Sequence, residues 1–184
     1  METTYLETER MILHKYTPED LQFLFEHRAK SEIMALLGLS TAEDFIKEQK
    51  KTEGGYKTYD RTIVHFKLAL KKNKQVVGGA GFHNWYSQHR RAELGYALTV
   101  EDAKRQGYMS EAVSTILNYG FTQMNLNRVE AFISPNNKAS LRLIEKFAFT
   151  QEGHLRQHFL RDDTTEDSFV FSLLREEYVR AHKV

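Results

Sequence analysis

A glycine flanked by basic and hydroxyl residues, within positions 104–110, could bind an anion. The segment reads Lys104-Arg105-Gln106-Gly107-Tyr108-Met109-Ser110, and apolar residues at helical spacing follow it. The first turn of a helix leaves backbone N–H groups without intrahelical partners, and the helix dipole favours negative charge there. Because Lys104 and Arg105 lie beside those donors, the segment predicts a phosphate or pyrophosphate site. A basic helix start that binds no ligand fits this segment equally well.

Glu93 is a candidate for proton transfer. It lies in an alternating segment, Ala92–Leu98, which is typical of a strand. The residues that share its face are small or short, so a ligand could fit beside the carboxylate and lose a proton to it. These neighbours are Gly95, Ala97 and Thr99. The alternative is a structural carboxylate that pairs with Arg90, Arg91 or a neighbouring strand.

The stretch from Ala92 to Phe149, together with Thr8–Leu13 and Ser172–Arg175, resembles the GNAT acetyltransferases. The likeness is greatest to their RimJ/RimL-type ribosomal-protein N-acetyltransferase branch. In that family the cofactor signature is Gln/Arg-x-x-Gly-x-Gly/Ala; here Lys104 retains the charge, and Met109 replaces the small last residue. The resemblance implies acetyl-CoA as the acyl donor, without a metal. The residues implied to bind it are Leu98, Thr99, Val100, Lys104, Arg105, Gln106, Gly107, Tyr108, Met109, Ser110 and Asn137.

The segment from Asn137 to Phe149 resembles the second cofactor element of the family, with Ala148 in place of a glycine. The resemblance implies that Asn137 binds the pantetheine arm. Many members protonate the departing thiolate with a tyrosine seven residues later, but this chain has Ile144 there. Ser140 matches the serine to which the RimL-type branch assigns that role. There are two alternatives. Water could be the acid, or Ser140 could serve only to form a hydrogen bond at the helix terminus.

The resemblance also implies a catalytic route and an acceptor. Glu93, eleven residues before Lys104, occupies the place of a family base glutamate. The resemblance implies that the acetyl group passes directly from acetyl-CoA to an amine. A backbone N–H near Leu98 would stabilise the oxyanion, and Ser140 would protonate the departing sulfur. The chain has no cysteine, which excludes a cysteinyl intermediate and leaves a serine ester open. The implied acceptor is a protein N-terminal amine. A polyamine or aminated antibiotic, and a non-catalytic acyl-CoA sensor, are the alternatives.

The predicted elements fit one α/β (or α+β) domain over residues 1–184, in the order of the GNAT fold. We expect a mixed, mostly antiparallel sheet of about seven strands with helices on both faces. The strands that carry Glu93 and Val129 should diverge and form the cofactor cleft. The expected strands are Met11–His14, Val64–Leu70, Val76–Phe82, Ala92–Leu98, Arg128–Ser134, Leu155–Leu160 and Phe169–Leu174. The expected helices begin at Pro18, at a capping box Ser40–Glu43, after Gly107 and after Asn137.

Composition narrows the function classes. The chain has 184 residues, 41% of them hydrophobic, and a formal charge of +1, so no overall field favours nucleic acid. The N-terminal residues are polar and no apolar run spans a membrane, so a cytoplasmic protein is expected. His154 and His158 are expected as surface residues of a strand, although a metal-dependent hydrolase is a further alternative. A homodimer is expected to be feasible, and the sequence locates no interface.

Overall fold

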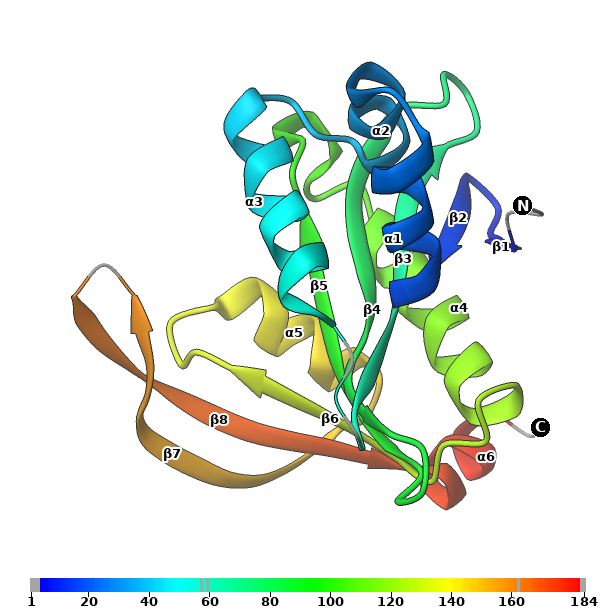
Figure 1. Ribbon diagram of the computed structural model, residues 1–184. Coiled ribbons are helices and arrows are strands. Elements are labelled where there is room, and N and C mark those ends of the chain that lie inside the picture. Colours follow the sequence, from blue (N-terminus) through cyan, green and yellow to red (C-terminus); the bar gives the residue numbers. More distant parts are fainter. Residues whose placement is uncertain (1–3, 57, 59, 162, 183–184) are drawn as a thin grey trace.

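The computed structural model describes residues 4–56, 58, 60–161 and 163–182, and its strands form one sheet (Figure 1). The sheet has eight strands in the order β1-β2-β3-β4-β5-β6-β8-β7, and β5–β6 is the one parallel pair among them. The strands are β1 (Tyr5–Glu7), β2 (Met11–Tyr16), β3 (Thr62–Leu70), β4 (Val76–Tyr86), β5 (Arg91–Leu98), β6 (Arg128–Ile133), β7 (Thr150–Arg161) and β8 (Thr164–Leu174).

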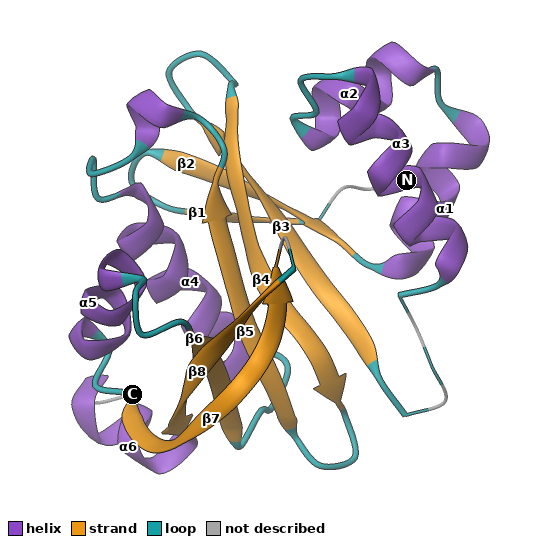
Figure 2. Ribbon diagram, turned by 90° about the vertical axis from the view of Figure 1, so that its left-hand side faces the viewer, coloured by secondary structure: helices purple, strands orange, loops and turns teal. Residues whose placement is uncertain are grey.

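Helices cover both faces of the sheet, as expected (Figure 2). The first three helices lie on one face, and the last three lie toward the other. They are α1 (Pro18–His27), α2 (Lys30–Leu37), α3 (Ala42–Gly54), α4 (Tyr108–Thr122), α5 (Lys138–Lys146) and α6 (Arg175–His182). A main apolar core joins the sheet to α4 and α5, and a smaller one joins β2 to α1 and α2. No helix among the described residues is long and apolar enough to cross a bilayer.

The expected fold class, a mixed and mostly antiparallel sheet of about seven strands, is confirmed, and the eighth strand is β1, which has only three residues. Two expectations about the helices need correction. Three helices follow β2 and not two, since α2 is short and its N-cap, Ala29, offers no side-chain cap. The capping box of α3 is Thr41 with Asp44, one position later than expected, because the Thr41 hydroxyl accepts from the Asp44 N–H at 3.0 Å.

The sheet forks between β5 and β6. Only three residue pairs join these strands, from Arg91 with Arg128 to Glu93 with Glu130. Beyond that point β5 continues along β4 to Leu98, while β6 continues along β8. The predicted divergence is therefore confirmed. Glu93 is the last residue of β5 that pairs with β6.

Ion pairs hold the strands together below the fork. Arg91 and Arg128 both bind Glu130, at 3.0 and 2.8 Å. Arg128 also donates to Glu152 on β7, whose other contact is the Ser172 hydroxyl of β8 at 2.7 Å. These bonds lower the pKa of Glu152 to about 2, with the Arg128 contact as the main cause. The network neutralises Glu130, the carboxylate next to Glu93 in the register.

Candidate active site

The loop before α4 presents free backbone donors. Gly107 caps the helix with φ +81°, a left-handed conformation that favours glycine, and Arg105 has φ +58°. Within the described ranges, no protein acceptor receives the backbone N–H groups of residues 105–110. These donors lie at the positive end of the α4 dipole. The loop therefore suits a phosphate or pyrophosphate group, the kind of ligand for which its sequence was a candidate.

Arg10, which sequence reasoning did not include in the site, braces this loop. Its backbone N–H and Nε donate to the two carboxylate oxygens of Glu111, at 2.8 and 2.7 Å. Its Nη1 donates to the Gln106 carbonyl at 2.9 Å, and its guanidinium lies 4.4 Å from the centre of the Tyr108 ring. A residue about a hundred positions away thus fixes the loop. The only sequence signal was its place within Thr8–Leu13, one of the segments that resemble the family.

The other side chains of the loop point in different directions. Lys104 pairs with Glu101 at 2.5 Å, so a local acid already balances its charge. Met109 packs against the main core, which leaves the backbone donors of the loop uncovered. Ser110 accepts from Lys146 of α5 at 2.6 Å. Arg10, Glu111 and Lys146 line a hollow of about 500 Å³ beside Gly107. Glu111 balances the charge of Arg10, so Lys146 is the added positive charge that the sequence analysis missed.

The free edge of β5 leads from this loop toward Glu93. Thr99 and Val100 donate their N–H groups to the Val77 carbonyl, at 2.9 and 3.4 Å, so these donors are not available to a ligand. Alternate residues of a strand direct their backbone groups to opposite edges, which turns the Leu98 N–H toward the fork. Five residues separate Leu98 from Glu93, about 16 Å of strand. A long ligand anchored at Gly107 can run along this edge and end at Glu93.

The N-terminus of α5 forms the other wall of the cleft. Asn137 is its N-cap, and its Oδ1 accepts from the Ser140 N–H at 3.1 Å. Ile144 is fully buried in the core and has no acidic group to offer. The Ser140 side chain is half-buried, and no hydrogen bond from its hydroxyl to the helix terminus exists among the described residues. The structure thus gives no support to a helix-terminus role for that hydroxyl.

Tyr96, which the sequence analysis did not single out, brings a second hydroxyl close to Ser140. Its Oη is buried and has no hydrogen bond of ordinary geometry to any described residue. Burial raises the pKa of Tyr96, and the nearby Ser140 hydroxyl partly offsets that rise. A buried hydroxyl without a protein partner calls for a water or a ligand. The sequence could not reveal this role, because a tyrosine on the apolar face of a strand looks the same whether or not its hydroxyl has a hydrogen-bond partner.

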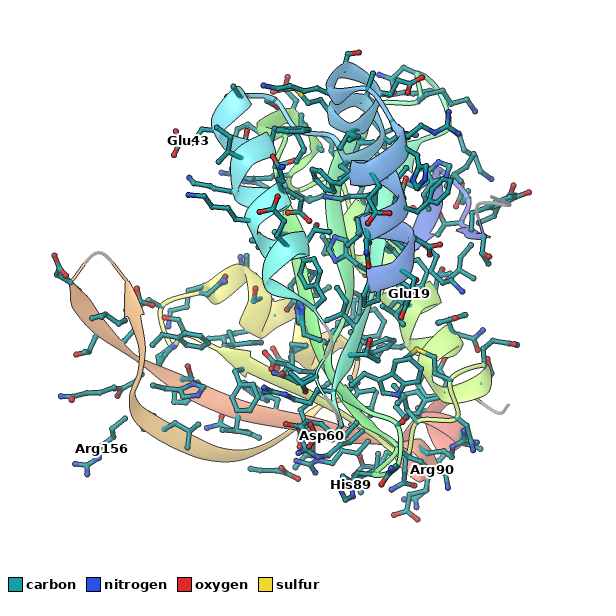
Figure 3. All side chains as sticks on the ribbon, in the orientation of Figure 1. Glu19, Glu43, Asp60, His89, Arg90 and Arg156 are labelled. Atoms are coloured by element: carbon teal, nitrogen blue, oxygen red, sulfur yellow. The ribbon has the colours of Figure 1, made fainter. Side chains whose placement is uncertain are left out.

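Glu93 makes no ion pair with the two arginines expected to compete for it. Asn84 of the neighbouring strand β4 donates from Nδ2 to Glu93 Oε2 at 2.8 Å, so the contact with a neighbouring strand that the structural alternative expected is present. Arg91 binds Glu130, and Arg90 binds the Asn125 side chain at 3.0 Å. Arg90 lies at the β4–β5 turn, at the opposite end of the molecule from Glu43 of α3 (Figure 3). The carboxylate is held by a neutral amide and stays available at the fork.

A hollow of about 990 Å³ lies between the first three helices and the sheet. Gly95, Ala97 and Thr99 line it, which agrees with the predicted face of small residues. Two imidazoles that the sequence analysis missed cover its glycines. A β-carbon placed on Gly95 would lie 1.7 Å from His83 Nε2, and one on Gly79 would lie 2.6 Å from His65 Nε2. The glycines thus provide space for histidine rings as well as for a ligand.

Both histidines are neutral at neutral pH. Burial, followed by the charge of Lys67, lowers the pKa of His65 to about 3. Burial also lowers the pKa of His83, while Glu93 acts in the opposite direction. The His83 side chain nevertheless remains exposed to the hollow. His83 pairs with Glu93 in the β4–β5 register, so a neutral imidazole and a carboxylate lie together where an amine would enter.

The two histidines considered as metal ligands lie on one strand. His154 and His158 are on β7, a strand as expected, and His154 binds Asp167 at 2.7 Å. His158 packs between the rings of Phe132 and Phe159. Among the described residues, no three His, Asp or Glu side chains gather closely enough to hold a metal.

Three features occur together in this cleft: the sheet forks, a helix start suited to anions lies at the end of one branch, and a carboxylate lies at the branch point. They fit the site of an acyl-CoA-dependent acyltransferase. Residues 10–150 match the family model described as an acetyltransferase (GNAT) domain. The chain belongs to the GNAT acetyltransferases and is an N-acetyltransferase of that type. Enzymes of this family use acetyl-CoA, and the free donors around Gly107 fit its phosphates.

The chain is similar to N-acetyltransferases along nearly its whole length. It is 31% identical to YoaA of Bacillus subtilis, over 92% of this chain and 96% of that protein. It is 32% identical to p20 of Bacillus licheniformis, over 97% and 99%. The crystal structure of a GNAT-family acetyltransferase from Bacillus anthracis superimposes with a TM-score of 0.67 at 26% identity, covering 95% of this chain and all of that one.

Proposed function

We propose that the protein transfers the acetyl group of acetyl-CoA to the N-terminal amine of a protein, as the RimJ/RimL-type branch does. The position of Glu93 carries this proposal, because in the Glu93–Glu130 pair at the fork it is the carboxylate that makes no ion pair with a described residue. A relative from Bacillus subtilis, provisionally named the ribosomal N-acetyltransferase YdaF, supports the branch at 29% identity over 56% of this chain. One sheet builds both the cleft and the hollow, so we assign the activity to a single domain.

The proposed reaction is direct transfer. The acceptor nitrogen forms a bond to the thioester carbonyl carbon, the carbon–sulfur bond breaks, and CoA leaves as a thiolate. Glu93, held by Asn84, takes the proton that the amine loses, which reaches the carboxylate through a chain of waters along β5. The Leu98 N–H faces the fork and stabilises the oxyanion. Ser140 returns a proton to sulfur, and the buried Tyr96 hydroxyl beside it can replace that proton.

Two alternatives receive less support. The Escherichia coli spermidine N(1)-acetyltransferase is 25% identical over 52% of this chain, but a polycation would meet unpaired positive charge from Lys67 in the hollow. A non-catalytic acyl-CoA sensor was suggested by the departure of Met109 from the signature. Because Met109 packs into the core, the donors of the loop remain free. That departure therefore gives no reason to expect a silent site.

Acetylation of ribosomal proteins tests the proposal. Purified ribosomal proteins would be incubated with acetyl-CoA and the enzyme, and their intact masses and N-terminal peptides recorded. We expect one acetyl group at the amino terminus of a small subset, and none with Glu93→Gln. Acetylation confined to spermidine or other small amines would overturn the protein acceptor.

A further inference from the structure

Lys67 brings an unpaired ammonium group into the acceptor hollow. It lines the hollow from β3, and no described residue forms a hydrogen bond or ion pair with its Nζ. Burial lowers the pKa of Lys67, with Glu48 opposing and Lys51 adding to that shift. A desolvated ammonium without a partner is unfavourable. An anion that enters the hollow would remove this penalty.

The acidic side chains of the hollow are already engaged. Asp44 accepts from the Thr41 N–H and hydroxyl, at 3.1 and 2.8 Å. Glu48 accepts from the Tyr56 hydroxyl at 3.0 Å and pairs with Lys51 at 3.5 Å. Glu48 is thus balanced by a cation, whereas Asp44 receives neutral donors on one oxygen and keeps its negative charge. The charged residues of the lining are Lys47, Lys51 and Lys67 against Asp44 and Glu48.

The sheet fixes how far Lys67 lies from the reaction point. Lys67 pairs with Gly79, which pairs with Ala97 on β5, and Glu93 stands four residues along that strand. All four therefore face the same side of the sheet. Strand spacing and rise place the Lys67 and Glu93 Cα atoms about 16 Å apart. Both side chains leave the same face, so this gap closes to about two residues of a peptide, each ~3.5 Å long, where the two side chains lean toward each other along the sheet.

We propose that the acceptor carries a carboxylate or phosphate within about two residues of the amine that is acetylated, and that Lys67 binds this anionic group. The inference rests on the proposed function, since Glu93 marks where the amine must lie. In a protein acceptor the anion is an acidic residue at the second or third position. In a small acceptor the same chemistry belongs to an acidic amine.

Acceptor kinetics with matched peptides test the inference. Short peptides with an N-terminal serine would carry Glu, Gln or Lys at both the second and third positions. With the wild type we expect kcat/KM for the Glu peptide to exceed that for the Gln peptide at least tenfold, and the Lys peptide to be slowest. Lys67→Met, which keeps the length of the side chain, should reduce the Glu-to-Gln ratio below about threefold. Lys47→Met is the control, because Lys47 lines the same hollow but pairs with Glu43, and it should leave the ratio unchanged.

The outcomes separate this inference from the proposed function. If the peptides are acetylated without regard to charge, or if Lys67→Met keeps the preference, the anion site is wrong and the protein acceptor stands. If no peptide reacts, glutamate with glutamine and phosphoethanolamine with ethanolamine provide matched small amines. A Lys67-dependent preference for the acidic member would support the anion site and overturn the protein acceptor. Equal rates within each pair, or no reaction of any of them, would overturn the anion site too.

Two controls show whether the lysine variants fold and bind acetyl-CoA normally. Far-UV circular dichroism and the affinity for acetyl-CoA would be measured for both lysine variants. Lys67 does not line the hollow beside Gly107, so unchanged acetyl-CoA affinity is expected. If Lys67→Met fails to fold, Lys67→Arg replaces it. Arginine keeps the charge and should preserve the Glu preference, and a loss of preference with retained acetyl-CoA affinity would count against the anion site.

Discussion

Glu93 and Glu130 form the last residue pair that joins β5 to β6, and their environments differ. Glu130 is bound by Arg91 and Arg128, whereas Glu93 receives one hydrogen bond from the neutral amide of Asn84. Two adjacent carboxylates thus have different roles. One holds the branches together, and the other is free to exchange a proton at the point where they separate.

Replacement of Glu93 by Gln should lower kcat about 100-fold or more, because the amide keeps the shape and removes the base. The acetyl-CoA affinity should be unchanged, since the pyrophosphate site lies at the other end of β5. Steady-state kinetics with calorimetry would measure both quantities. Asn84→Ala should have a smaller effect on kcat, because it only releases the carboxylate. Full kcat in Glu93→Gln would assign the base elsewhere, with His83 the next residue to test.

Ser140→Ala and Tyr96→Phe should both lower kcat, and the double variant should be no slower than the slower single variant, since the two hydroxyls serve one proton transfer. Tyr96→Phe should leave the free energy of unfolding within about 1 kcal/mol of the wild type, because the buried hydroxyl that it removes lies near only the Ser140 hydroxyl among the described residues. Chemical denaturation and single-turnover rates would provide these values. Retention of full kcat by Ser140→Ala would exclude the serine as the acid.

Gly95→Ala should displace the His83 ring, since the new β-carbon would lie 1.7 Å from Nε2. His83 is exposed to the hollow and can swing away, so we expect a small change in melting temperature with a drop in kcat/KM for the acceptor. In a His83→Ala background the same substitution should have little further effect. A double-mutant cycle would measure this coupling. Additive effects of the two substitutions would show that the ring and the glycine act independently.

His65 should make stability depend on pH. Its folded pKa of about 3 lies below that of the unfolded chain, so the unfolded state alone binds a proton as the pH falls below about 6.5. The stability that neutral His65 contributes is therefore fully present above about pH 6.5 and is lost as the pH falls toward 3. Where the unfolded state binds one proton more than the folded state, the free energy of unfolding falls by about 1.4 kcal/mol per pH unit. His65→Gln should make the slope of unfolding free energy between pH 6 and 4 shallower by up to one proton. The same substitution at exposed His89 serves as the control, and identical slopes in His65→Gln and the wild type would contradict the expectation.

The sequence predicted the parts of the molecule that are local in the chain. Alternation identified β5 and the face of Glu93, and the caps at Thr17 and Asn137 began α1 and α5 at the expected residues. Side chains that reach the site from distant elements left no such pattern. Arg10 braces the Gly107 loop from the β1–β2 turn, and Lys67 and His83 enter the hollow from neighbouring strands.

Two further differences have physical causes. β7 begins at Thr150, five residues before the expected Leu155, because its exposed, polar first half shows no burial pattern for alternation to reveal. Tyr96 appeared as an ordinary core residue, since the missing partner of a hydroxyl can be recognised only when the surrounding atoms are placed. The position of Glu93 at the fork came from the family resemblance and not from its spacing alone.

The most direct test of the central claim is a calorimetric titration of acetyl-CoA into the wild type, Gly107→Asn and Gly107→Asp. Asn and Asp tolerate the left-handed backbone similarly and differ in charge, so the pair isolates electrostatics at the proposed phosphate site. We predict saturable binding by the wild type, a loss of a few-fold with Asn, and a loss of at least 100-fold with Asp. Equal affinities of folded Asn and Asp variants would contradict a phosphate site at this helix, and with it the account of how the chain binds its acyl donor.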